Sequence, residues 1–154
     1  MAEPQRFVLD CSVALSWYFA DEANRYADDV AALFPNAEAV VPALWHLEIA
    51  NALVMGERRK RSTVAQATTW LTFLSSLPIV LDGETVARAW AQALSLARTY
   101  DLTTYDAAYL EVALRLNLPL ATLDSKLKAA CAAAGVAIFR PQTKSPAGGT
   151  PPAT

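Results

Sequence analysis

The chain has 154 residues, 54% hydrophobic and 18% charged, which fits one domain with a substantial core and excludes general disorder. Its single histidine excludes a two-histidine nuclease and a histidine-rich zinc site, and its two cysteines are too few for a four-cysteine zinc site or a disulfide scaffold. With 15 acidic and 13 basic residues, the net charge of −2 predicts no global basic surface for nucleic acid, so catalysis by ionisable side chains would rely on carboxylates.

The sequence predicts neither a secretory signal nor a membrane span. The first apolar run, 7–9, ends at Asp10 and is too short for the apolar region of a signal peptide. The longest uncharged stretch, 62–81, contains nine Ser, Thr, Gln and Pro residues, which makes it too polar for a lipid-facing helix. Together with two unpatterned cysteines, these features predict a soluble cytoplasmic protein.

Apolar periodicity and turn residues divide the chain into alternating strands and helices. In chain order we predict a strand at 7–9, helices at 12–19 and 23–34, a strand at 39–41, helices at 43–59 and 63–77, a strand at 78–81, helices at 84–100 and 105–116, a strand at 119–122, a helix at 125–134 and a strand at 136–139. Short apolar strands separated by helices imply an α/β fold with a parallel sheet covered on both faces. Residues 141–154, rich in Pro, Gly, Ser and Thr, are predicted to be a disordered tail.

Two acids follow predicted strands, where ligands of open parallel sheets bind. Asp10 comes directly after 7–9, and either opens the turn to Ser12 or takes part in a site. Asp124 follows 119–122 and, taken alone, is explained as the cap of the next helix.

Two further acids lie on predicted helices without a basic partner three or four residues away. Glu48 has Asn51 as its polar companion one turn on, which favours a carboxylate held for a purpose. Asp106, taken alone, is explained by the capping pattern Thr103-x-x-Asp106. Considered jointly, four acids at one edge of the sheet would repel one another unless a cation lay among them, and Mg²⁺ and Mn²⁺ prefer such oxygen ligands.

Four segments in chain order resemble the motifs of the PIN-domain family. They are V-L-D-C-S-V-A-L-S-W at 8–17, A-L-W-H-L-E-I-A-N-A-L at 43–53, L-T-T-Y-D-A-A-Y-L-E-V-A at 102–113 and L-P-L-A-T-L-D-S-K-L at 118–127. Within the family, the short single-domain form resembles the VapC toxins of type II toxin–antitoxin pairs. The resemblance covers about residues 7–139, and the tail has no counterpart in it.

The resemblance implies a three-layer αβα sandwich over residues 1–140, with a parallel five-stranded sheet in the order 3-2-1-4-5. It implies that one or two Mg²⁺ or Mn²⁺ ions are held by a catalytic tetrad of Asp10, Glu48, Asp106 and Asp124. Three polar residues match supporting positions beside these acids, namely Ser12, Asn51 and Thr122.

The implied activity is that of a metal-dependent ribonuclease, a hydrolase in which metal-activated water cuts RNA to leave a 5′-phosphate and a 3′-hydroxyl. The implied partners are a second copy of the chain and a VapB-like antitoxin. A basic run could also contact RNA phosphates, but a solvated helix end favoured by the helix dipole is the preferred interpretation. The run consists of Arg58, Arg59, Lys60 and Arg61. The aromatic run 17–19 is assigned either to base stacking or to the core.

Two alternatives remain at this stage. A receiver-type phosphoacceptor domain shares the doubly wound fold, but it needs adjacent acids after the first strand and a lysine after the last, where this chain has Cys11 and Arg140. A catalytically silent PIN scaffold that serves only as a binding partner would not need four mutually repelling acids.

Overall fold

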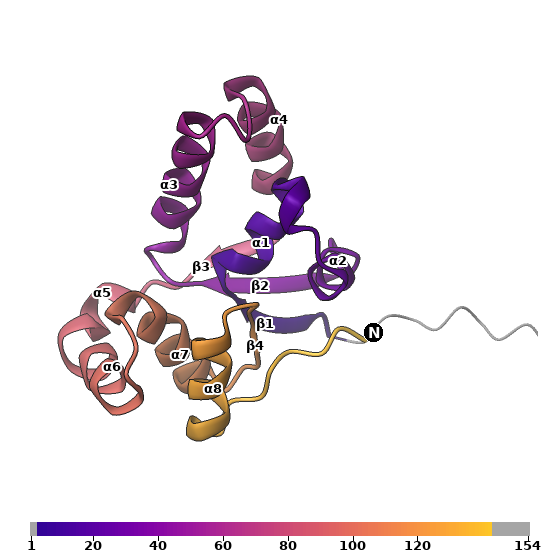
Figure 1. Cartoon of the computed structure of the whole chain (residues 1–154). Coiled ribbons are helices and arrows are strands. Elements are labelled where there is room, and N and C mark those ends of the chain that lie inside the picture. Colours follow the sequence, from indigo (N-terminus) through magenta and orange to yellow (C-terminus); the bar gives the residue numbers. More distant parts are fainter. Residues whose placement is uncertain (1–2, 143–154) are drawn as a thin grey trace, which may run out of the picture.

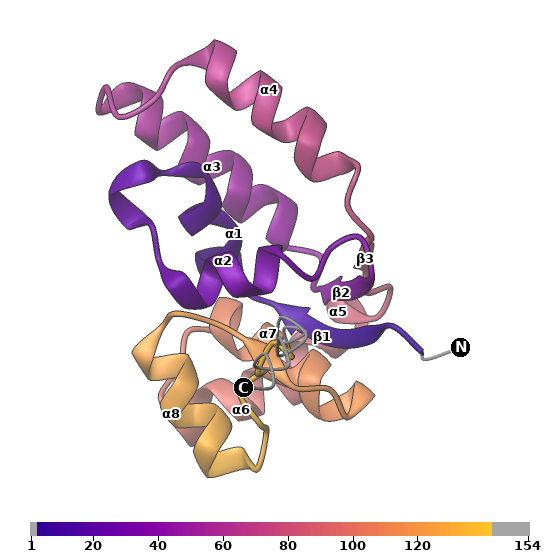
Figure 2. The same ribbon diagram turned by 90° about the vertical axis from the view of Figure 1, so that its right-hand side faces the viewer.

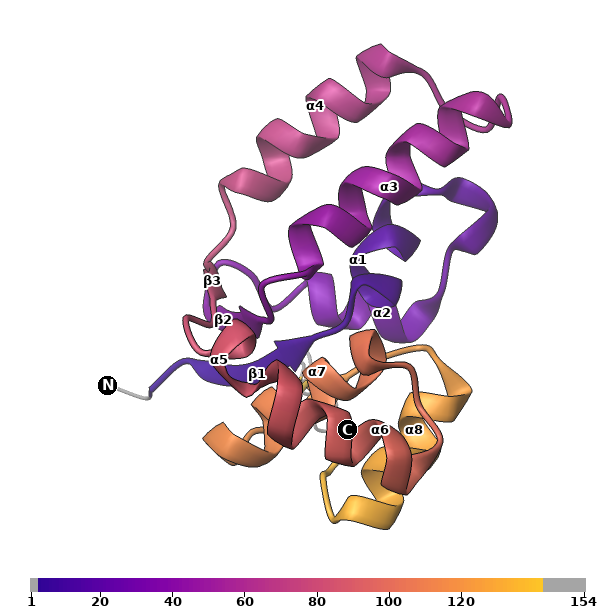
Figure 3. The same cartoon turned by 90° about the vertical axis from the view of Figure 1, so that its left-hand side faces the viewer.

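The computed structural model describes residues 3–142 and has the predicted α/β class (Figure 1). A parallel sheet in the order β3-β2-β1-β4 lies between two layers of helices. Its strands are β1 Gln5–Leu9, β2 Ala37–Val41, β3 Ile79–Leu81 and β4 Leu120–Ala121. On one side lie α1 Cys11–Tyr18, α2 Arg25–Ala31, α3 Trp45–Arg58 and α4 Val64–Ser75. On the other lie α5 Thr85–Arg88, α6 Leu94–Tyr100, α7 Thr104–Leu116 and α8 Ser125–Ala134 (Figures 2 and 3).

The strand order confirms the first four places of the expected 3-2-1-4-5 sheet, but the fifth strand was wrong. The segment 136–139 is reduced to one parallel bridge, between Leu120 and Ile138. Its neighbour β4 has only two residues. Pro119 O and Ala121 O accept hydrogen bonds from Val8 and Asp10 on the other side, which leaves Leu120 to face 136–139. Two backbone hydrogen bonds, Leu120 N to Ala137 O and Phe139 N to Leu120 O, therefore make up the contact.

One predicted helix is shorter than expected and another is interrupted. The helix expected over 23–34 is α2, which follows a 3₁₀ turn at Ala20–Glu22 (η1) and starts where the Asn24 side chain accepts a hydrogen bond from the Ala27 N–H. The expected helix over 84–100 contains a π-helical turn at Ala89–Ala93 (η2) between α5 and α6. Trp90 lies on that turn with 92% of its surface exposed.

The core forms around β1, as its apolar run predicts. Phe7, Val8 and Leu9 are completely buried, because helices cover both faces of a parallel sheet. The Phe7 ring stacks on Phe139, with centroids 4.1 Å apart, so the last described segment still closes the core although it forms no full strand. None of the helices within residues 3–142 is long and apolar enough to cross a membrane.

A buried ion cluster around Arg115 joins α7 to the end of β3 and the start of α5. The guanidinium group donates to Glu111 on its own helix at 2.7 Å and to both oxygens of Asp82 at 3.1 and 2.8 Å. It also reaches Glu84 at 3.0 Å. Asp82 and Glu111 are 8% and 4% exposed, so their charges would be costly without this partner.

The protonation of Asp82 follows from this cluster. Burial alone would raise the pKa of Asp82, but hydrogen bonds from Arg115 and Thr85 bring it below its usual value. Because the folded pKa lies below that of the unfolded chain, the stabilisation is complete above about pH 4 and is lost as the pH falls through the folded value.

Replacing Arg115 should therefore destabilise the protein strongly. We expect Arg115→Met to lower the free energy of unfolding at pH 7 by about 3–5 kcal/mol, because it leaves two buried carboxylates unpaired. Arg88→Met, which breaks the more exposed pair with Glu84, should cost less than about 1 kcal/mol. Urea unfolding at pH 7 and pH 3 measures both, and the Arg115 effect should shrink at pH 3. Equal losses for the two variants would contradict a stabilising cluster.

Candidate metal centre

Asp10 is the most buried of the four candidate acids, with 3% of its surface exposed. The register pairs Leu9 with Ala121, so Asp10 emerges from β1 beside Thr122 at the end of β4. Its Oδ2 atom accepts hydrogen bonds from Ser12 Oγ at 2.6 Å and from Thr122 Oγ1 at 2.7 Å. Ser12 and Thr122 thus lie where the sequence placed them, and together they fix one oxygen of this carboxylate.

Glu48 lies in the first turn of α3 and is half-buried. Its Oε1 atom accepts a hydrogen bond from Tyr109 Oη at 2.5 Å. Asn51, the expected companion, is exposed and makes no hydrogen bond to Glu48 among the residues that the structure describes. The polar companion of Glu48 is therefore Tyr109, which the sequence analysis did not identify.

Asp106 and Asp124 both begin helices. Thr103 caps α7 by accepting from the Asp106 N–H at 3.1 Å, and Asp124 caps α8 by accepting from the Leu127 N–H at 2.8 Å. The capping interpretation is thus confirmed for Asp124, whereas at Asp106 only the Thr103 half of the capping pattern is present among residues 3–142. Capping does not remove these acids from a site, because the Asp106 cap uses its backbone and the Asp124 cap uses only Oδ1.

The charges of the four acids act on one another, although the acids come from four different parts of the chain. Burial is the main reason why the pKa values of Asp10, Glu48 and Asp106 are raised, and mutual repulsion adds to it. Asp124 raises the pKa of both Asp10 and Asp106. One cation opposes this field at Asp106, the ammonium group of Lys126. The structure thus gathers the predicted acids into one negative region beyond the end of β1.

The donor set of this region fits a hard divalent cation. Carboxylate oxygens are the ligands that Mg²⁺ and Mn²⁺ prefer, and such an ion would relieve the repulsion between them. As the side chains stand, no three His, Cys, Asp or Glu residues among 3–142 are placed to hold one ion together. The chemistry of the acids therefore fits a metal, while their present arrangement is not a closed set of ligands.

The basic run at the end of α3 divides into two parts. Arg58, Arg59 and Lys60 are exposed. Arg61 instead pairs with Asp21 at 2.8 Å and lies over the Phe19 ring, 4.1 Å from its centroid. Contact with RNA thus remains a prediction for Arg58, Arg59 and Lys60. The Arg61 side chain is instead held by Phe19 and Asp21.

The structure also has a groove between α1 and α4. It has a volume of about 590 Å³, and aromatic side chains form part of its lining, among them Trp17, Tyr18, Trp70 and Phe73. Three buried polar atoms beside it have no hydrogen-bond partner within residues 3–142, namely Tyr18 Oη, Ser62 Oγ and Trp70 Nε1. Trp17 donates to Ala27 O at 2.7 Å and Phe19 is buried, which favours a packing role for these two residues.

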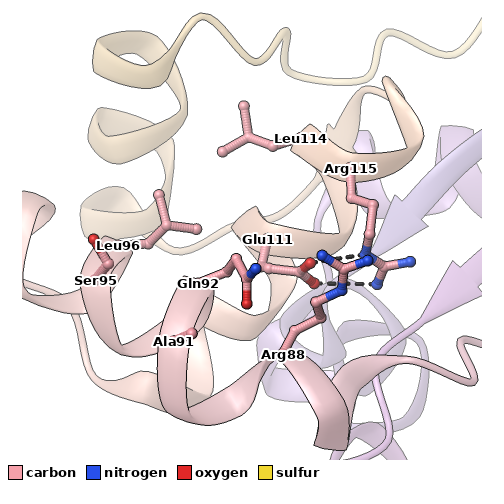
Figure 4. A pocket seen from close by; sticks show the side chains of 8 residues that line it. All are labelled: Arg88, Ala91, Gln92, Ser95, Leu96, Glu111, Leu114 and Arg115. Atoms are coloured by element: carbon pink, nitrogen blue, oxygen red, sulfur yellow. Dashed lines mark hydrogen bonds and ion pairs between the residues drawn. The ribbon is translucent and has the colours of Figure 1, made fainter.

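A larger cavity of about 670 Å³ lies away from the acids, between η2, α6 and α7 (Figure 4). Glu111 and Arg115 form part of its wall and bond to each other. Helical periodicity places them on the opposite side of α7 from Asp106 and Tyr109. The charged groups of this wall, Arg88, Glu111 and Arg115, are already paired, so this cavity offers less chemistry than the acidic region.

Comparison with solved structures shows that the fold recurs in several proteins. PAE2754 from Pyrobaculum aerophilum is 27% identical, with a TM-score of 0.59 over 83% of this chain and 80% of that one. VapBC2 from Rickettsia felis, solved bound to a DNA fragment from its promoter, is 13% identical, with a TM-score of 0.58 over 81% and 92%. FitAcB from Neisseria gonorrhoeae is 20% identical, with a TM-score of 0.56 over 88% and 97%.

The last two resemblances are below 25% identity and show the fold alone. Among curated proteins, no sequence matches this chain significantly. The model of the PIN-domain family, in contrast, matches residues 7–133. This match spans all four acids and most of the described chain, and the chain therefore belongs to the PIN-domain family.

Proposed function

We propose that the protein is a metal-dependent ribonuclease, the toxin of a type II toxin–antitoxin pair, acting in the cytoplasm. The observation that carries this proposal is the convergence of four carboxylates, from four parts of the chain, beyond the end of β1. Membership of the PIN family and the fold shared with a toxin–antitoxin complex from Klebsiella pneumoniae, 18% identical with a TM-score of 0.54, support it.

In this proposal Asp10, Glu48, Asp106 and Asp124 hold one or two Mg²⁺ or Mn²⁺ ions. When bound, such an ion lowers the pKa of a water molecule and neutralises charge on the phosphate. The chain itself supplies position: Ser12 and Thr122 fix one oxygen of Asp10, and Asp124 is held at the start of α8 by the Leu127 N–H. The products would be a 5′-phosphate and a 3′-hydroxyl.

The charge distribution is compatible with an RNA substrate once the four acids are set aside. Four of the 15 acidic residues belong to the proposed centre, so the other 11 face 13 basic residues. The remainder of the chain thus has an excess of two positive charges. Lys126, whose charge already acts on Asp106, is the nearest candidate for contact with an RNA phosphate, and the exposed run 58–60 is a more distant one.

The aromatic groove between α1 and α4 is the site that we propose for a VapB-like antitoxin. The groove has aromatic walls, and Phe73 at its edge has 51% of its surface exposed. Apolar side chains of a docked segment would cover these rings and remove their apolar surface from water.

A second surface supports a homodimer. Leu47, Val86 and Trp90 are 74%, 80% and 92% exposed. The Ala43 N–H donates to Thr85 Oγ1 at 3.1 Å, which brings the start of α3 beside the start of α5. Large apolar side chains exposed together at such a junction are typical of protein interfaces, and aromatic residues often dominate the binding energy there.

A silent PIN scaffold is the second candidate, favoured by one observation. No three potential ligands within residues 3–142 are placed to bind one ion as they stand. Metal binding distinguishes the two functions, because a ligand that binds only the folded state stabilises it by about 2.7 kcal/mol at 100 times its Kd.

The Asp106→Asn variant tests the nuclease directly. Wild type should cleave RNA only with Mg²⁺ or Mn²⁺, and Mn²⁺ should raise its Tm. Asp106→Asn should lose cleavage and most of that shift, because one charged ligand is removed. Asp28→Asn, an exposed change on α2, should behave as wild type. Sequencing of RNA ends and thermal unfolding measure these effects, and cleavage that persists in EDTA would contradict the proposal.

Without metal, the Asp106→Asn substitution should instead stabilise the folded protein. The pKa of Asp106 is raised first by burial and then by Asp10 and Asp124. A raised pKa means that its contribution to stability is complete below the unfolded pKa and is lost as the pH rises through the folded value. At pH 7 without metal, Asp106→Asn should therefore have a higher Tm than wild type. This difference should disappear near pH 3, and a lower Tm at pH 7 would show that the carboxylate is not under repulsion.

Two charged substitutions should distinguish the proposed dimer interface from the proposed antitoxin groove. Trp90→Glu should convert a dimer to a monomer in light scattering, because the interface would have to bury a charge. Phe73→Glu, at a half-exposed groove residue, should keep the dimer. It should weaken binding of the antitoxin encoded beside the gene by about tenfold or more. Each variant is the control for the other, and loss of both properties in either one would argue against two separate surfaces.

A further inference from the structure

Tyr109 connects two helices that lie on opposite sides of the sheet (Figures 2 and 3). The residue belongs to α7, is completely buried, and bonds through its hydroxyl to Glu48 on α3. The 2.5 Å separation is at the short end of the range for a hydroxyl that donates to a charged oxygen. Its position three residues after Asp106 places both side chains on the same face of α7.

The hydrogen bond restricts how Glu48 can turn. A buried phenol needs a partner for its O–H group, and Glu48 Oε1 is that partner. With Oε1 held by Tyr109, the second oxygen of the carboxylate takes a fixed direction. A glutamate has three rotatable bonds in its side chain, so without such an anchor its carboxylate would have to be ordered when a ligand binds.

The same arrangement is found at Asp10, whose Oδ2 is held by two hydroxyl groups. Asp10 and Glu48 therefore each have one oxygen bonded to buried or half-buried protein hydroxyls. Groups that orient metal ligands in this way usually matter nearly as much as the ligands themselves.

We propose that Tyr109 is a positioning residue for the divalent metal, which orients Glu48 through its hydroxyl group. The role rests on the proposed metal-dependent function. It assigns to the buried tyrosine a task beyond filling the core, because a phenylalanine would fill the same space.

The test is a cycle of variants with Mn²⁺ affinity as the readout. Tyr109→Phe should weaken Mn²⁺ binding about 10–100-fold, as measured from the electron paramagnetic resonance signal of free Mn²⁺. In the Glu48→Gln background the same change should have little further effect, because the oriented carboxylate is already gone. Tyr26→Phe is the matched control, since the Tyr26 hydroxyl also bonds across the fold, to Phe139 O at 2.7 Å, and its loss should leave Mn²⁺ affinity unchanged.

A second measurement separates positioning from damage to the fold. Tyr109→Phe should need more Mn²⁺ for half-maximal RNA cleavage but recover the wild-type kcat when Mn²⁺ is saturating, which a partly unfolded protein would not do. Equal Mn²⁺ affinity in wild type and Tyr109→Phe, or an equal loss in the Glu48→Gln background, would overturn the positioning role alone. A wild type that binds no Mn²⁺ would overturn the proposed function and this role with it.

Discussion

The burial of Asp10 at the end of β1 is the constraint on which the rest of the centre depends. β1 is covered on both faces, so the first polar residue after it remains inside the protein and must find donors there. Ser12 supplies one from α1 and Thr122 one from the end of β4. The hydrogen bond from Asp10 N to Ala121 O adds a backbone link between the same strands. The carboxylate thus joins the two central strands as well as facing the other acids.

The fold places further acidic residues, and not basic ones, around the Asp10 carboxylate. Basic residues are available, but the most buried of them, Arg115, is bound to three acids at the far end of α7. The structure therefore neutralises its charges away from β1 and leaves repulsion beside Asp10. An excess of negative charge at one place, with compensation elsewhere, is typical of a site whose counter-ion is not part of the chain.

The sequence was sufficient for the features that depend on local chemistry. Runs such as 7–9 predicted strands because parallel strands are apolar on both faces, and the capping roles of Thr103 and Asp124 follow from residues within one turn. It failed for the segment 136–139, whose pairing is limited by the short length of its neighbour β4. It also did not identify Tyr109 as the partner of Glu48, because the two residues are 61 positions apart in the chain. The predicted tail at 141–154 lies almost entirely outside the described residues and stays a prediction.

The shared hydrogen bonds of Asp10 affect the choice of an inactive protein for trapping an RNA complex. An alanine at position 10 would remove the acceptor that the hydroxyl groups of Ser12 and Thr122 share. Such a change would disturb the junction of β1 and β4 as well as the chemistry. Asp106 is half-buried and uses its backbone N–H for its cap, so its side chain can be neutralised with the scaffold left in place. A variant for crystallising an RNA complex should therefore carry its substitution at Asp106 on α7 and keep Asp10 at the end of β1.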